Sequence, residues 1–165
     1  MADRTIAERL QPSLLDRLTD DAPESLKEGR DARVIDVRRL REIIARDLSW
    51  LLNTSNLESS IDTERYQNVV VSTVNYGVRE VAGDFSTVRR AQEIQASIRE
   101  AIQRFEPRIG EGSVRVDLRP SEGQTETVIH FDVRAEMWAQ PLPQELYIRT
   151  EVDLITGELT LERMG

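Results

Sequence analysis

The spacing of hydrophobic residues changes near Gly110, and this change predicts the fold class. Before Gly110 most apolar residues recur at intervals of three and four, which is typical of helices that bury one face. After Gly110 they alternate with polar residues, which is typical of strands with one buried and one wet face. We therefore expect an α+β protein: N-terminal helices, then a C-terminal antiparallel β-meander of about four strands, with the helices packed on one face.

The first long helix is expected over residues 36–53. Asp36 is a suitable N-terminal cap, and Asn53 is a suitable C-terminal cap. Ile43 and Trp50 lie off the main apolar stripe, so the helix is predicted to be apolar on two sides and to need a cover on the second side. The residues of the main stripe are Val37, Leu40, Ile44, Leu48 and Leu51.

A second long helix is expected between Ser86, its predicted cap, and Pro107, which disfavours helical geometry at the preceding residue. Its predicted buried stripe consists of Val88, Ala91, Ile94, Ile98, Ile102 and Phe105. Residues 66–77 are ambiguous, because their valines favour a strand while Tyr66, Val70 and Val74 fit one helical face.

Four strands are predicted after Gly110, and the last of them is short and acidic, which is typical of a sheet edge. Residues 155–158 are expected to form a tight turn before this last strand. The predicted inward positions, strand by strand, are Val114, Val116 and Leu118, then Ile129, Phe131, Val133, Ala135 and Met137, then Leu146, Ile148, Val152 and Leu154, and finally Leu159 and Leu161.

The N-terminal part is predicted to be a docking arm and flexible linker over residues 1–33, followed by a single domain over residues 34–165. Charged and polar residues dominate positions 19–33, as in a solvated linker. Leu14, Leu15 and Leu18 precede it on a short helix that is expected to begin near Pro12. This apolar patch either folds back onto the core of the same chain or docks against another chain, and the sequence leaves both alternatives open.

Composition excludes several classes of function. The chain has no cysteine and one histidine, His130, which excludes a disulfide, a thiol nucleophile and a cysteine-type or multi-histidine metal site. No bound metal or cofactor is expected. A formal net charge of -8 at pH 7 repels phosphate backbones, so nucleic acid is not an expected partner. No apolar run approaches the roughly 18–20 residues that cross a bilayer, and no signal-peptide core is present. A cytoplasmic location without membrane insertion is therefore expected.

Candidate catalytic chemistry is limited to one pair of carboxylates. Glu106 and Asp117 are the pair that would act as acid and base on a glycan such as peptidoglycan. Arg104 and Arg108 flank Glu106, and a guanidinium close to Glu106 defeats the acid role, which needs a protonated carboxyl group. We therefore expect no catalytic site, and we interpret His130 as a solvated surface residue. Residues 106–108 are instead expected to form a stiff bend, used either for paired contacts with a partner or for an internal ion pair.

Several short segments, taken together, resemble one family. Residues 46–54 (RDLSWLLNT) lie on the first long helix, residues 74–77 (VNYG) follow it, and residues 105–109 (FEPRI) join helix to sheet. Residues 12–18 (PSLLDRL) are similar to the N-terminal segment of the same family. In this order and spacing they resemble the small wedge subunit of contractile-tail baseplates, and more narrowly TssE, its form in bacterial type VI secretion systems. The relatives of TssE are phage wedge proteins of the gene-twenty-five, or lysozyme-like, family.

The resemblance implies a cytoplasmic structural protein without enzymatic activity, despite the lysozyme-like label. Such subunits bind the other baseplate wedge proteins and provide the platform on which contractile sheath subunits begin to polymerise, with no small-molecule substrate. The resemblance also suggests that the C-terminal sheet accepts strands from the first sheath ring. The residues expected to bind partners, from the matching motifs and the arm, are Glu106, Pro107, Arg108, Arg46, Asp47, Trp50, Leu14, Leu15 and Leu18.

Overall fold

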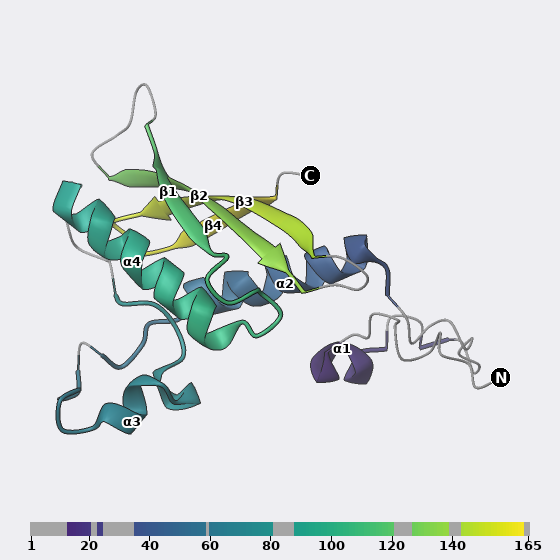
Figure 1. Cartoon of the computed structure of the whole chain (residues 1–165), viewed down its shortest axis with the longest axis horizontal. Coiled ribbons are helices and arrows are strands. Elements are labelled where there is room, and N and C mark those ends of the chain that lie inside the picture. Colours follow the sequence, from purple (N-terminus) through teal and green to yellow (C-terminus); the bar gives the residue numbers. More distant parts are fainter. Residues whose placement is uncertain are drawn as a thin grey trace.

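The computed structural model describes residues 13–20, 23–24, 35–58, 60–80, 88–120, 127–138 and 143–163. The predicted α+β order of helices followed by strands is confirmed (Figure 1). The predicted cap Ser86, Pro12 and most of the predicted linker lie outside the described residues. In chain order, the elements are α1 (Leu14–Leu18), α2 (Val37–Leu52), α3 (Gln67–Val70), the 3-10 helix η2 (Thr73–Asn75), α4 (Val88–Phe105), β1 (Arg115–Arg119), β2 (Val128–Met137), β3 (Gln144–Asp153) and β4 (Leu159–Arg163).

The described strands form an antiparallel meander in the order β1-β2-β3-β4, as predicted. β2 and β3 pair over their whole length and form the centre of the sheet, whereas the shorter β1 and β4 form its edges. Gly157, in the turn between β3 and β4, has a φ of 75° and donates its N–H to the carbonyl of Asp153 at 2.8 Å. The predicted tight turn and the edge position of β4 are thus both confirmed.

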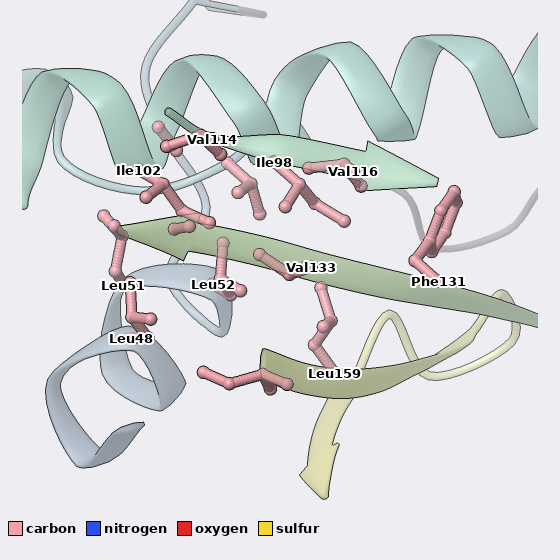
Figure 2. Packing of buried hydrophobic residues seen from close by; sticks show 14 of the residues in the cluster. Leu48, Leu51, Leu52, Ile98, Ile102, Val114, Val116, Phe131, Val133 and Leu159 are labelled. Carbon is pink, nitrogen blue, oxygen red and sulfur yellow. The ribbon is translucent and has the colours of Figure 1, made fainter. Parts of the chain in front are cut away.

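The core lies between one face of the sheet and the helices α2 and α4. Leu48 and Leu52 of α2 and Ile98 of α4 approach the inward side chains of the strands, among them Phe131 and Val133 (Figure 2). All five are almost fully buried. Burial of one such side chain contributes about 1.5–3 kcal/mol, so the apolar periodicity of the sequence was strong enough to predict which faces meet.

The ends of α2 form as predicted. The carboxylate of Asp36 accepts a hydrogen bond from the backbone N–H of Arg39 at 2.7 Å, which is the expected N-terminal cap. At the other end, the N–H of Asn53 donates to the carbonyl of Ser49 at 3.2 Å. On the second side of the helix Ile43 is buried, but the side chain of Trp50 is 50% exposed. The second side is therefore covered at one position and open at the other.

Two predicted core positions are wrong, and one segment whose structure was left open is resolved. Val88 and Leu118 were expected to point into the core, but their side chains are 76% and 46% exposed. Val88 is the first residue of α4, and Leu118 lies near the end of an edge strand, so each sits where the opposing layer stops. Residues 66–77 form neither a strand nor one continuous helix, but α3 followed by η2. The hydroxyl of Ser72 accepts from the N–H of Val74 at 3.3 Å and starts the second helical turn afresh.

Residues 74–77 hold the long connection between α2 and α4 in place. The side chain of Asn75 is fully buried, where it accepts from the N–H of Leu57 at 3.0 Å and donates to the carbonyl of Val70 at 3.1 Å. Gly77 has a φ of 124°, and a Cβ added there would lie 2.1 Å from the carbonyl oxygen of Thr54. Only glycine fits this close approach, so the Asn-Tyr-Gly sequence has a structural cause.

Candidate functional site

Five charged side chains from three separate segments form a continuous ion-pair network: Asp16 of α1, Arg46 and Asp47 of α2, and Glu106 and Arg108 after α4. Nη1 of Arg46 lies 2.6 Å from Oδ1 of Asp16, and its Nη2 lies 2.7 Å from Oδ1 of Asp47. Nη2 of Arg108 lies 2.6 Å from Oδ2 of Asp47. Nε and Nη2 of Arg108 also donate to the two carboxylate oxygens of Glu106. Acidic and basic groups alternate, and the network joins α1, α2 and the end of α4.

The way in which α4 ends positions Glu106 and Arg108. The N–H of Glu106 still donates to the carbonyl of Ile102 at 3.0 Å, so Glu106 continues the last helical turn. Pro107 then ends the helix as predicted. The backbone N–H of Arg108 donates to Oε1 of Glu106 at 3.1 Å, and its carbonyl accepts from the N–H of Trp138, just beyond β2, at 2.7 Å. Arg108 is thus held between the helix end and the sheet.

Burial and hydrogen bonding act against each other on the charges of the network. Burial opposes ionisation of Asp16, but hydrogen bonds from Arg46 and Ser13 outweigh it and hold the pKa of Asp16 below its ordinary value. Burial likewise opposes the charge of Arg108, and hydrogen bonds to Glu106 and Asp47 outweigh it and raise the pKa of Arg108. Arg108 therefore remains a cation, and its two carboxylate partners keep it compensated inside the fold.

Tyr76 connects the loop of residues 74–77 to the network. Its ring packs edge-on against Phe105, with a centroid separation of 5.4 Å. Burial raises the pKa of the Tyr76 hydroxyl, and the negative charges of Asp47 and Glu106 raise it further. The phenol therefore stays protonated and neutral in the field of these two carboxylates.

Exposed apolar side chains lie on two of the elements that the network joins and are together called the apolar surface: Leu14, Leu15 and Leu18 of α1, and Trp50 of α2. The side chain of Leu18 is 76% exposed, and α1 contributes no buried residue. The guanidinium carbon of Arg46 lies 4.9 Å from the centre of the Trp50 ring, a cation–π contact. Asp16 pairs with Arg46, while the leucines of α1 face outward. Of the two alternatives for this patch, packing into the chain's own core is not what the structure has.

The carboxylates of the enzymatic alternative are placed apart. Glu106 is buried and both of its oxygens bind Arg108, whereas Asp117 is exposed on β1, opposite Asp132 of β2. Arg104 turns away from Glu106 and pairs with Glu58 at 3.1 Å. The guanidinium that was expected to oppose an acid role of Glu106 is present and belongs to Arg108. The internal ion pair expected as one alternative for residues 106–108 is therefore confirmed.

His130 and the acidic side chains offer no further site. His130 is partly buried, not fully solvated, and its Nδ1 lies 3.1 Å from Oε1 of Glu151 on the neighbouring strand. Among the residues that the structure describes, no group of three or more histidine, aspartate or glutamate side chains is arranged to hold a metal ion. Within the same residues, no helix combines the length and the apolar character that crossing a membrane requires.

Two members of this region were not found from the sequence. Asp16 lies between the leucines of the predicted apolar patch, and no spacing rule relates it to Arg46, 30 positions later. Tyr76 belongs to the segment of residues 74–77, but periodicity gave no reason to place it against Phe105. The sequence did single out Arg46, Asp47, Glu106 and Arg108, and the structure brings these four together.

A comparison with known protein families matches residues 38–142 to the family described as baseplate wedge protein gp25. The matched region runs from α2 to just beyond β2 and contains every member of the ion-pair network except Asp16. No significant match was found among curated proteins or among solved structures. Since the family match covers more than half of the chain, this protein belongs to the gp25 family of baseplate wedge proteins.

Proposed function

We propose that this chain is a structural wedge subunit of the TssE type in the cytoplasmic baseplate of a type VI secretion contractile apparatus. In this role it binds other wedge proteins and starts polymerisation of the contractile sheath. Membership of the gp25 family supports the baseplate role. The observation that carries the proposal is the ion-pair network, which joins three segments beside an exposed apolar surface.

The network acts as a scaffold for the partner-binding residues. Glu106 is 5% exposed, so its charge is used inside the chain and is not available as a separate contact. Its pairing with Arg108 fixes the bend that presents the exposed Pro107, and the Arg46 pair fixes α1 beside Trp50. A surface that is ordered before binding loses less conformational entropy when a partner docks.

The apolar residues on this scaffold supply most of the proposed binding energy. Tryptophan is enriched among the residues that dominate protein interfaces, and Trp50 is half exposed beside a guanidinium. α1 is too short to be stable alone, so its three outward leucines suit a helix that docks into a groove of a wedge partner. The partner surface is therefore proposed to include Leu14, Leu15, Leu18, Trp50 and Pro107, held in place by Arg46, Asp47, Glu106 and Arg108.

Sheath initiation is proposed to use a different part of the molecule, the edge of the sheet. An extended segment of a sheath subunit would add as a further strand, with backbone hydrogen bonds giving affinity and alternating side chains giving register. β4 is an edge strand of the meander and supports this proposal by its position.

The wedge role is tested by measuring how strongly the purified chain binds the other purified wedge subunits of the same apparatus. Trp50→Ala and Leu18→Ala are expected to weaken binding at least ten-fold without changing thermal unfolding, because both side chains are exposed. Val88→Ala is the matched control, since Val88 is as exposed as Leu18 but starts α4, far from α1 (Figure 1). Unchanged binding in both test variants contradicts the proposed surface.

A further inference from the structure

The backbone groups along the two sheet edges can be assigned from the pairing register. In an antiparallel ladder, alternate residues point their N–H and C=O groups to opposite sides. The N–H of Asp153 donates to the carbonyl of Glu158 at 3.0 Å, so Thr160 and Glu162 face β3. Leu159, Leu161 and Arg163 therefore turn their backbone groups outward, to the free edge of β4. The same alternation turns Val116 and Leu118 of β1 outward.

The edge of β1 is blocked at two outward positions. The side-chain amide of Gln95, on α4, donates to the carbonyl of Val116. Pro120, at the next outward position after Leu118, has no N–H to donate. Native sheets commonly protect edges in this way, with proline and with groups from neighbouring elements. Within the part of the chain that the structure describes, Leu118 is the one outward residue of β1 that a partner strand would find open between these two obstacles.

The edge of β4 is blocked at one end and open at the other. The side chain of Asn53, at the end of α2, accepts from the N–H of Leu159 at 2.8 Å and donates to its carbonyl, also at 2.8 Å. The amide of Asn53 thus occupies the position that a residue of a fifth strand would take opposite Leu159. Among the described residues, no group takes the corresponding position opposite Leu161 or Arg163.

We propose that Asn53 sets the register of the sheath segment that adds to β4, by ending its pairing before Leu159 and confining it to Leu161 and Arg163. The occupant is an extended polypeptide segment, because only a strand presents donors and acceptors with the two-residue repeat of this edge. This inference rests on the proposed role in sheath initiation and adds the residue that limits the contact.

The first step of the test is amide hydrogen exchange of the whole chain alone, read residue by residue. The Leu159 amide is expected to exchange slowly in the wild type and at least ten-fold faster in Asn53→Ala, whereas the Leu161 amide is expected to exchange fast in both. A Leu159 amide that remains equally slow in Asn53→Ala shows that Asn53 does not occupy this position and overturns the inference.

The second step adds the purified sheath subunits of the same apparatus. In the wild type, hydrogen exchange of the Leu161 and Arg163 amides is expected to slow at least ten-fold, while exchange of the Leu159 amide is unchanged. In Asn53→Ala the partner strand is expected to pair with Leu159 as well, so sheath subunits also slow the exchange of the Leu159 amide. Two results would overturn the inference while leaving the proposed sheath role intact. Either sheath subunits bind but the Leu161 and Arg163 amides still exchange fast, or they bind Asn53→Ala but its Leu159 amide still exchanges fast. If they do not bind the wild type, the proposed sheath role fails with it.

A pair of proline variants tests whether the sheath segment adds to the edge of β4, without altering Asn53. Leu161→Pro removes an outward N–H but no hydrogen bond of the β3–β4 ladder, so it leaves the sheet paired and is expected to weaken sheath binding at least ten-fold. Leu118→Pro removes an outward N–H from the blocked β1 edge and serves as the matched control, with binding expected to remain as in the wild type. Equal binding by both variants overturns the assignment to β4.

Discussion

The core beneath the sheet and the ion-pair network at the end of α4 stabilise the molecule by different means. Core residues such as Phe131 and Ile98 lie at buried positions of a periodic pattern within one element. Another apolar side chain of similar volume can fill much of the same space. The network instead depends on five particular charges from three segments, and each needs its neighbour. The core therefore sets whether the chain folds, while the network sets where α1, Trp50 and Pro107 lie.

Deleting a core side chain is the change expected to have the largest effect. Phe131 is fully buried, and Phe131→Ala leaves a cavity in the core beneath the sheet. The free energy of unfolding should fall by about 3–5 kcal/mol. Urea denaturation measures this loss, and a decrease below 1 kcal/mol would mean that this part of the core is not closely packed.

A glycine packed against Thr54, just beyond the end of α2, is expected to have the next largest effect. Gly77→Ala places a methyl group against the carbonyl of Thr54 at a φ that alanine avoids. We expect a loss of about 2–3 kcal/mol in the free energy of unfolding, with the position of Tyr76 beside Phe105 also disturbed. Gly112→Ala is the matched control, because Gly112 also has a positive φ but nothing lies within 4 Å of an added Cβ. Equal losses in the two variants would show that strain alone, without the Thr54 contact, accounts for the effect.

Breaking the network should cost less stability than deleting core but should affect binding more. Arg108→Met leaves Glu106 buried without its guanidinium, and an uncompensated buried charge is unfavourable. Because Arg108 is itself partly exposed, the expected loss is about 1–2 kcal/mol, together with at least ten-fold weaker wedge binding. Arg115→Met, on an exposed position of β1, is the control for removal of an arginine. Wild-type wedge binding by a folded Arg108→Met protein would contradict the scaffold role of the network.

The smallest effect is expected where the network reaches α1, and it depends on pH. The pKa of Asp16 in the folded chain lies below its ordinary value of 3.8, so ionised Asp16 favours the docked helix. The contribution is complete above the ordinary value and is lost as the pH falls through the lower, folded-state value. Methyl NMR signals of Leu15 should therefore report release of α1 in acid, and Asp16→Asn should remove this step. The same acid transition in Asp16→Asn would assign the release to another group.

The difference between the two regions also explains what the sequence predicted. Stripes such as Ile94, Ile98 and Ile102 repeat within one element, so their burial follows from local spacing. Val88 and Leu118 continue the same patterns but lie at element ends, where spacing gives no information about how far the opposing layer extends. The pairing of Asp16 with Arg46 depends on the path of the chain between them, which composition and periodicity do not encode.

The resemblance to wedge subunits carried more of the functional prediction than the physical pattern did. It selected Arg46 and Asp47, whereas the residues themselves already offered an ion pair for residues 106–108, and the structure joins all four charged side chains. The resemblance did not predict the two hydrogen bonds between the side chain of Asn53 and the backbone of Leu159, which depend on tertiary geometry alone. The family match over residues 38–142 supports the baseplate assignment, while contacts with particular partners stay proposals.

The central claim is that this chain acts by fitting between other proteins of a contractile apparatus. Its most direct test is to delete the gene in cells that carry a fluorescent sheath subunit and to count assembled sheaths by microscopy. We predict that sheaths are absent in the deletion strain and return with the wild-type chain, but not with a folded Leu161→Pro chain. Full-length, contracting sheaths in the deletion strain would contradict the account.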